Sequence, residues 1–395
     1  MRYSDIQKLH EAGLITGEQR QKIIERFQLQ EDGGNKFLAI VSMLGAVLIT
    51  AGIALLIAAH WNEIPRGVKI ATGILLMLGA HAGGWRLRAG HVKYHKTGEA
   101  LHLIGSCLFL ANIALLGQIY NIVSRPPNAI LLWWIGLAAL PWLLRSKAQH
   151  VLLLLAFGLW FGLEANECGG WIYCESDRQV LLYALLGLVY LGAGYCLRET
   201  RFSEFAGVTE KLGLSAFLIF LYPTAWKDFF GWENSEVRPW LFPALAAFAL
   251  LLTAIGLKNL TALSRQWRWT WLAALAGMAV FMATVWFGCW QLDQAGGAHQ
   301  YFWAESWSYF AAMLALFVFC LLLIQVGLQE RSPFLVNLGE VFIALDILAA
   351  YCNLFGSMKR TGVMFLISGV FLIVFGVYLE KKRRSLIKRI RPQTS

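Results

Sequence analysis

The sequence is poor in charged residues. Asp, Glu, Lys and Arg make up only 15% of its 395 residues, whereas an ordinary soluble protein contains about 25%. Low-complexity tracts are absent and there are only nine prolines. Hydrophobic residues make up 58% of the chain, and the mean hydropathy is +0.56. This composition excludes a disordered chain and a water-soluble globular domain, since neither could carry so much apolar surface.

Motifs of catalysis and of cofactor binding are also absent from the sequence. It contains no Gly-x-Ser-x-Gly nucleophile elbow, no phosphate-binding P-loop, no His-Glu-x-x-His motif, no dinucleotide fingerprint and no Cys-x-x-Cys pair. His81, His102 and His150 lie near the ends of apolar runs, where imidazole can bind a metal or haem. Isolated histidines are ordinary at a membrane interface, and we favour that interpretation. We expect no metal and no other cofactor, and we assign no enzymatic activity.

Twelve apolar runs follow a polar prefix. They lie at about 37–59, 67–85, 100–122, 129–144, 149–164, 178–197, 206–223, 239–257, 268–290, 306–328, 333–352 and 362–380. Most are close to the ~20 residues that an α-helix needs to cross a membrane. We predict an all-α, polytopic membrane protein with about twelve transmembrane helices, although Glu210 and Lys211 weaken the seventh. Because no cleavable signal peptide precedes the first run, we expect it to stay in the mature chain.

The loops on alternate sides of these runs differ in charge. The loops of one side, with the C-terminal tail, hold nineteen basic residues: Arg86, Arg88, Lys93, Lys96, Arg145, Lys147, Arg198, Arg201, Lys258, Arg265, Arg268, Arg331, Lys381, Lys382, Arg383, Arg384, Lys388, Arg389 and Arg391. The opposite loops hold eight: Arg66, Lys69, Arg125, Arg178, Lys227, Arg238, Lys359 and Arg360. Cytosolic loops are the ones enriched in Lys and Arg. We therefore predict that both termini are cytosolic, and we attribute the net charge of +10 to membrane orientation rather than to nucleic-acid binding.

The polar prefix, residues 1–36, predicts two short amphipathic helices that form a cytosolic hairpin. Ser4 with Gln7, and Thr16 with Gln19, each fit a capping box, in which a hydroxyl accepts a backbone N–H and the glutamine reaches back. We expect the transmembrane domain to span residues 37–380.

A basic cytosolic tail, residues 381–395, follows the transmembrane domain. Within that domain, Ala-Gly-Ile-Ala-Leu-Leu at residue 51 recurs as Ala-Asn-Ile-Ala-Leu-Leu at residue 111. Two interpretations stay open. The helical hairpins 37–96 and 97–147 are a duplicated pair, which is typical of transporters, or helices rich in Leu and Ala match by chance.

Several short motifs are shared with one bacterial family. They are Gly13-Leu14-Ile15-Thr16-Gly17-Glu18-Gln19, Leu44-Gly45, Ala58-Ala59-His60-Trp61-Asn62 with Pro65 and Lys69, Gly117-Gln118-Ile119-Tyr120, Asn337-Leu338-Gly339 and Glu380-Lys381-Lys382-Arg383-Arg384. In these motifs the chain resembles DUF2157, a family of predicted membrane proteins of unknown function. His60 stands where the family more usually has Asn. The resemblance implies a bacterial inner membrane and no assigned reaction.

Strongly polar residues inside the predicted spans are candidate functional residues. A charged side chain at the centre of a membrane helix costs about 2.5 to 3.5 kcal/mol on insertion scales. Asp346 lies in the middle of the eleventh run, and Asn112 lies at comparable depth in the third. Asp346 is either a coupling site for a proton or cation, or one half of a polar clamp with Asn112. We favour the clamp.

Other polar residues lie closer to the ends of runs. Asn337 and Glu340 share a helical face near the cytosolic end of the eleventh run, and Gln325 lies at similar depth in the tenth. These residues either line a cytosolic vestibule, or Glu340 reaches headgroups or Arg331. Gln118, in the third run, completes this set of intramembrane polar candidates.

The predicted outer loops contain two cysteines and many tryptophans. Cys168 and Cys174 are separated by five residues that include Gly169 and Gly170. This segment can turn back on itself, so the two cysteines can form a disulfide bond in an oxidising periplasm. The tryptophans form either an aromatic belt, which we favour, or a platform that stacks a sugar or a lipid headgroup. The outer aromatic set comprises Trp171, Trp226, Trp232, Trp303 and Trp307.

Three classes of function fit these observations. The favoured one is a transporter or flippase-like carrier of a small solute or lipid. The second is a non-catalytic scaffold or sensor whose residues 1–36 bind a cytosolic protein partner. The third is an enzyme that acts on a lipid-linked substrate through Glu63 and Glu164. The lipid bilayer is the one partner common to all three, and none involves nucleic acid.

Overall fold

The computed structural model describes most of the chain between residues 63 and 355. The described residues are 10, 15–19, 21–22, 63–90, 95–174, 178–226, 229, 238, 240–261, 263–294, 298–355, 369 and 373. The chain forms two compact units, Met1–Thr72 and Gly73–Ser395. Helix α4 begins in the first unit and continues into the second.

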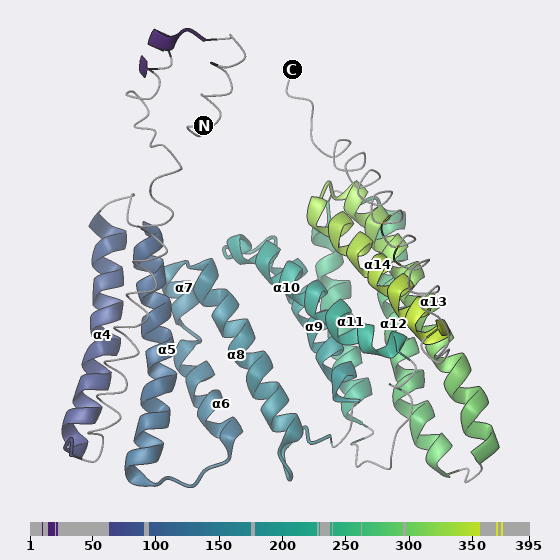
Figure 1. The fold of residues 1–395 in the computed structure, drawn as a ribbon, viewed down its shortest axis with the longest axis horizontal. Coiled ribbons are helices and arrows are strands. Elements are labelled where there is room, and N and C mark those ends of the chain that lie inside the picture. Colours follow the sequence, from purple (N-terminus) through teal and green to yellow (C-terminus); the bar gives the residue numbers. More distant parts are fainter. Residues whose placement is uncertain are drawn as a thin grey trace. The chain divides into compact units, whose positions relative to one another are not determined.

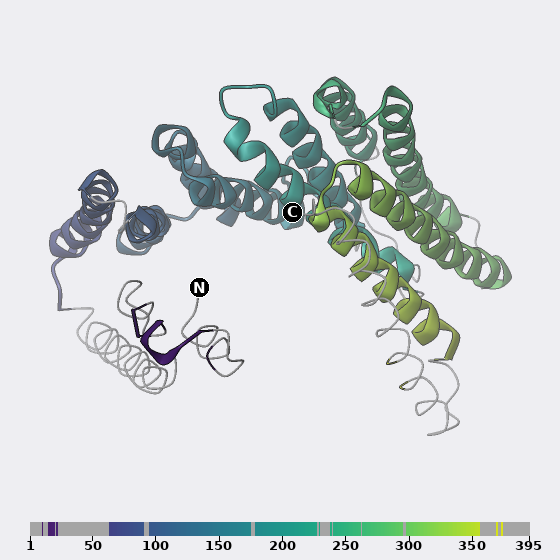
Figure 2. The same cartoon turned by 90° about the horizontal axis from the view of Figure 1, so that it is seen from above.

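The described residues form helices joined mainly by short loops (Figures 1 and 2). In chain order these are α4 (Arg66–Gly90), α5 (His95–Tyr120), α6 (Pro126–Leu137), α7 (Leu140–Leu144), α8 (Lys147–Asn166), α9 (Gln179–Leu197), α10 (Ser203–Leu221), η2 (Tyr222–Ala225), α11 (Leu241–Gly256), η4 (Leu257–Asn259), α12 (Arg265–Gln294), α13 (Ala298–Gln329) and α14 (Pro333–Phe355). The fold is all-α, as the sequence predicts.

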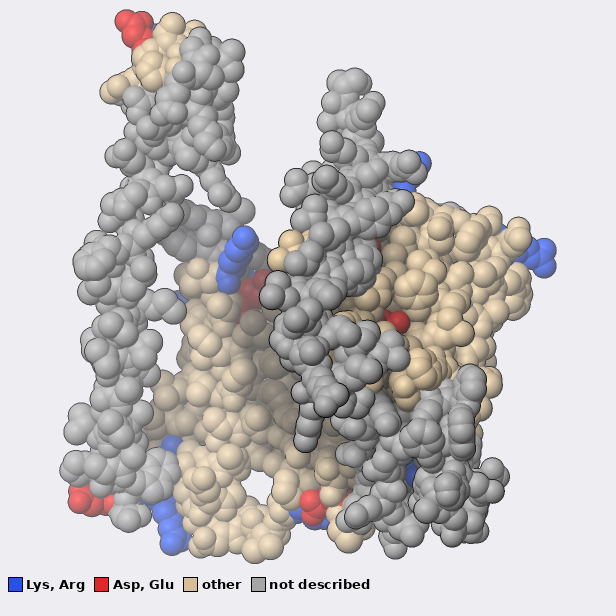
Figure 3. All heavy atoms as spheres, turned by 45° about the vertical axis from the view of Figure 1, so that its right-hand side comes forward, with Lys and Arg blue, Asp and Glu red and all other residues tan. Residues whose placement is uncertain are grey.

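Ten helical segments in the described part of the chain are long and apolar enough to cross a membrane. They correspond one by one to the second to eleventh predicted runs. The first run and almost all of the twelfth lie outside the described residues. On the face drawn in Figure 3, the described surface is mostly uncharged, with only a few scattered Lys, Arg, Asp and Glu groups. The prediction of a polytopic helical membrane protein is confirmed.

The fourth span is broken into two helices, α6 and α7. Pro141 lies in the first turn of α7 and has no N–H to donate, so the helix of α6 cannot continue through it. Arg145 then ends α7 in the left-handed conformation, with a φ of 46°. Ser146 starts α8 because its hydroxyl accepts the Gln149 amide at 3.3 Å. Both the fourth and fifth spans are longer than the apolar runs that predict them.

Helix α9 lies at the centre of the larger apolar core and packs against α10 and α11. Glycines allow this close approach. A Cβ on Gly213 of α10 would lie 2.5 Å from the Leu191 amide nitrogen and 2.7 Å from the Gly187 carbonyl oxygen of α9. Small residues are the usual means of bringing two membrane helices together, because lipid supplies no hydrophobic drive between them. A second, smaller core joins α5, α6 and α8.

One prediction about the N-terminal unit is confirmed. The Thr16 amide donates to Gln19 Oε1 at 2.9 Å, and the Gln19 amide donates to Thr16 Oγ1 at 3.4 Å, which is a capping box. The Ser4 and Gln7 pair lies outside the described residues. The hairpin of residues 1–36, its protein partner, the repeat that begins at residue 37 and the basic tail therefore stay predictions.

Candidate functional site

Asp346 lies near the middle of α14, and it is less exposed to solvent than Glu340, the other carboxyl group of that helix. It is only 4% exposed, and its Oδ1 has no hydrogen-bond partner among the described residues. Around it, Tyr222 of η2 donates its hydroxyl to the Leu345 carbonyl at 3.1 Å, and Cys320 of α13 is fully buried. The Cys320 thiol and the Tyr222 hydroxyl both lie within electrostatic range of Asp346. A carboxyl in these surroundings faces protein rather than lipid and keeps one oxygen available.

The structure gives Asn112 a different partner from the one predicted. Its Nδ2 donates to the carbonyl of Gly73 in α4 at 3.0 Å, and the side chain is 8% exposed. The absence of a side chain at Gly73 makes this bond accessible, because a Cβ there would overlap the Asn112 amide. Asn112 thus ties α5 to α4. The predicted clamp between Asn112 and Asp346 is not formed among the described residues.

The residues of the predicted cytosolic vestibule differ in burial. Glu340 is buried and Asn337 is half-buried, and each makes an interaction with another residue. Gln325 is exposed on α13, so it does not share a buried site with Glu340. Gln118 is exposed as well. The vestibule, and the alternative in which Glu340 reaches headgroups or Arg331, both stay predictions, and the two glutamines are exposed.

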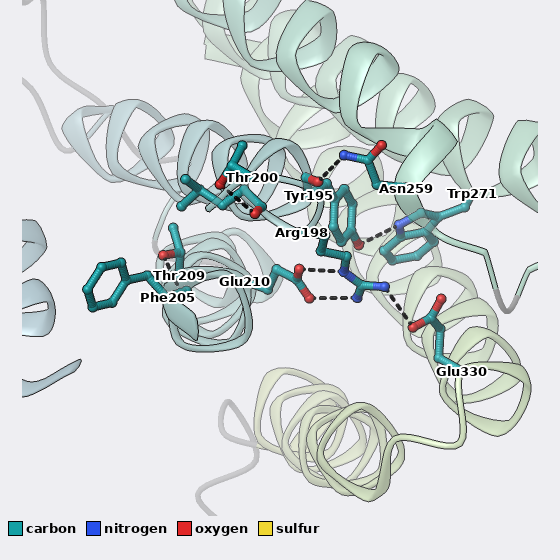
Figure 4. A network of polar contacts seen from close by, with 10 residues as sticks. Tyr195, Arg198, Thr200, Phe205, Thr209, Glu210, Asn259, Trp271 and Glu330 are labelled. Carbon is teal, nitrogen blue, oxygen red and sulfur yellow. Dashed lines mark hydrogen bonds and ion pairs between the residues drawn. The ribbon is translucent and has the colours of Figure 1, made fainter. Parts of the chain in front are cut away.

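An ion-pair network links three helices at one end of the bundle (Figure 4). Arg198, at the end of α9, donates Nε and Nη2 to the two carboxylate oxygens of Glu210, both at 2.7 Å. Its Nη1 donates to Glu330 Oε2 at 3.1 Å. The side chains of Glu210 and Glu330 are only 14% and 10% exposed. The two-pronged bond to Glu210 is strong and directional, and together with the single bond to Glu330 it holds α9, α10 and the end of α13 together.

The charge of Arg198 is maintained by these partners. Burial alone would lower the pKa of Arg198, but the hydrogen bonds and charges of Glu210 and Glu330 raise it overall. Beside the network, Trp271 donates its Nε1 to the Tyr195 hydroxyl at 3.1 Å. Sequence reasoning missed this network. The one indication in the sequence is Glu210, because an acidic residue within an apolar run needs a partner as well as weakening the span.

Two of the predicted interfacial histidines lie side by side. Nδ1 of His81 in α4 is 3.1 Å from Nδ1 of His102 in α5, so one ring donates and the other accepts. His150 of α8 instead has its Nε2 2.8 Å from the Thr209 hydroxyl of α10. No group of three His, Cys, Asp or Glu side chains suited to a metal occurs in the described part of the chain. These histidines connect neighbouring helices.

The loop after α8 keeps its two cysteines apart. Cys174 is fully buried, with its amide donating to the Ala165 carbonyl at 2.9 Å, whereas Cys168 is exposed. Both are free thiols, so the predicted disulfide is not formed. The physical reason is that the Cys174 side chain points into the apolar core. Burial raises the pKa of the Cys174 thiol to about 12, against a weaker opposing effect of Arg178.

Glu164 lies under the same loop and is already paired. Its Oε1 accepts Arg125 Nη2 at 3.0 Å and the Trp171 amide at 2.8 Å. Trp171 is 70% exposed and Trp226 is half-buried. Glu63, the other carboxyl of the enzyme hypothesis, is exposed. Trp232 and the side chains of Trp303 and Trp307 lie outside the described residues, so the aromatic belt stays a prediction.

The comparisons with known proteins concern the first part of the chain. Residues 7–150 match DUF2157, a family described as a predicted membrane protein. The resemblance seen in the motifs is confirmed over this region. No curated protein and no solved structure matches the chain. The DUF2157 match includes the His81, His102 and Asn112 contacts, while Asp346 and the Arg198 network lie beyond it.

Proposed function

We propose that this membrane protein is a carrier for a small solute or a lipid, and that Asp346 binds a coupling proton. The supporting observation is the buried Asp346 carboxyl in a helix suited to crossing the membrane, because its Oδ1 has no partner in the described part of the chain. An ionisable group at this depth is costly and marks a functional position by default. A carboxyl with an unoccupied oxygen can take up and release a proton without breaking an existing bond at that oxygen.

The competing interpretation of Asp346 is a structural clamp. It required Asn112 as the partner, and the amide of Asn112 donates to Gly73 instead. A clamp would also use the carboxyl oxygens as acceptors, whereas Oδ1 of Asp346 finds no donor among the residues that the structure describes. The bond between Asn112 and Gly73 and the unpaired Oδ1 of Asp346 both favour the proton-binding role.

The proposal places the chain in a bacterial inner membrane with both termini in the cytosol. The support is the charge bias of the loops, nineteen basic residues against eight. The Arg198 network and the loop that joins α11 to α12 are then at the cytosolic side, and the loop after α8 is at the periplasmic side.

Labelling with a hydrophobic carbodiimide, which reacts with protonated carboxyl groups, tests the proton-binding role. The full-length chain in phosphatidylcholine vesicles is treated over a range of pH, and labelled residues are identified by peptide mass spectrometry. We expect Asp346 to be labelled at low pH and progressively less as the pH rises, because the reactive form is lost. Glu164 is the matched buried carboxyl, and its ion pair with Arg125 should keep it unlabelled.

Transport itself is tested in inverted vesicles that hold an acidic interior, monitored with an acridine dye. A solute from a panel of small metabolites should dissipate the gradient in wild-type vesicles and not in Asp346→Asn vesicles, because Asn cannot release a proton. Equal dissipation in both, or carbodiimide labelling of Asp346 that does not change with pH, would show the proposal to be wrong.

A further inference from the structure

A pocket of about 410 Å³ lies where α11 ends and α12 begins. Three basic side chains line it: Lys258 from η4, and Arg265 and Arg268 from the first turn of α12. None of the described residues that line it is acidic. No ion pair among the described residues involves any of the three. The pocket therefore carries three positive charges without a counter-ion in the described part of the protein.

The position of these charges on α12 is unfavourable unless an anion is present. The N-terminus of a helix carries a partial positive charge and free N–H groups, so Arg265 and Arg268 repel it and a bound anion would relieve that repulsion. Arg268 is held in place, since it donates Nε to the Leu263 carbonyl at 3.0 Å and Nη1 to the Lys258 carbonyl at 3.1 Å. The pocket is thus partly preorganised for an anionic group.

The rest of the pocket wall is apolar and continues onto the outer face of the helices. Leu272 and Trp269 line the pocket, and Trp269 is 60% exposed. Leu251 and Ile255 of α11 are also at least half exposed, in a helix suited to crossing the membrane. A ligand that fits both parts of this surface has an anionic head and an apolar chain.

We infer that this pocket binds an anionic phospholipid, with its phosphate at Lys258, Arg265 and Arg268 and an acyl chain along Trp269 and Leu272. Basic pockets between transmembrane helices are suited to such headgroups. The site is separate from Asp346 and does not depend on the carrier function. It would fix the end of α11 and the start of α12 against the membrane surface.

Calorimetric titration of the full-length chain in a neutral detergent tests the site. The probes are short-chain phosphatidylglycerol, short-chain phosphatidylcholine and inorganic phosphate. The variant Lys258→Gln/Arg265→Gln removes two charges and leaves the structural Arg268 intact. Each lost charge should weaken phosphatidylglycerol binding roughly fivefold, so the double variant should bind about 25-fold more weakly.

The matched control is Lys147→Gln/Arg201→Gln, which removes two exposed basic residues of the same predicted side, one in α8 and one in the loop between α9 and α10. It should bind like wild type. Lys258→Gln alone, at an exposed position, serves if the double variant does not fold, and should show the single fivefold loss. Unchanged binding in the pocket variants, an equal loss in the control, or binding of phosphatidylcholine as tight as that of phosphatidylglycerol would overturn the inference. Inorganic phosphate that binds as tightly as the lipid would identify a free-anion site and overturn the lipid assignment.

Discussion

At the scale of single residues, burial decides the chemistry of the loop after α8. Cys174 is fully buried and its pKa is raised to about 12, so at neutral pH it is a protonated and inaccessible thiol. Cys168, six residues earlier, is exposed. A maleimide at pH 7 should therefore modify Cys168 and leave Cys174 unmodified until the protein is unfolded. Peptide mass spectrometry of the labelled chain measures both sites.

The control for this labelling is Cys168→Ser, which should remove the modification of this loop, while Cys174→Ser should leave it intact. A Cys168–Cys174 crosslink that disappears on reduction would contradict the prediction.

The sequence predicts the depth of a polar residue better than its partner. Asp346 was expected in the middle of a span, and it lies buried in α14. The Thr16 capping box was predictable because its atoms are three residues apart. The partner of Asn112 cannot be predicted in this way, because the choice between Gly73 and Asp346 depends on which helices are neighbours. The same holds for Glu210, whose partners Arg198 and Glu330 come from other helices.

At the scale of helices, two glycines of α10 provide a paired test of close packing. Gly213→Ala places a Cβ 2.5 Å from a backbone nitrogen of α9, which cannot move aside, whereas a Cβ at Gly207 meets nothing within 4 Å. We expect Gly213→Ala to destabilise the protein by about 1 to 3 kcal/mol. Gly207→Ala should be neutral or stabilising by up to about 1 kcal/mol, because Ala favours helix. Thermal unfolding in detergent measures both, and equal melting temperatures would contradict the packing argument.

Hydropathy predicts the spans well because a membrane helix must be apolar over its whole length. It does not predict the break between α6 and α7, which arises from Pro141 within an otherwise continuous apolar run. Nor does it identify α9 as the central helix, because lipid-facing and buried faces of a membrane helix are equally apolar. That distinction came from the glycine contacts of α9 with its neighbours.

At the scale of the whole molecule, the proposed orientation can be measured with an impermeant maleimide on intact cells. Cys168 should be modified from outside, since it lies in an outer loop in that orientation. Glu199→Cys, at an exposed position between α9 and α10, should be modified only after the cells are permeabilised. Modification in the opposite order would reverse the orientation, and with it the side on which the lipid pocket opens.

The Arg198 network has a consequence for motion. Glu210 and Glu330 share one guanidinium, so separating α9, α10 or the end of α13 would leave a carboxylate without its counter-ion at the edge of the membrane. We therefore expect these three helices to move as one rigid group. Any cycle that exposes a path first to one side of the bilayer and then to the other must divide the molecule between this block and the helices outside it.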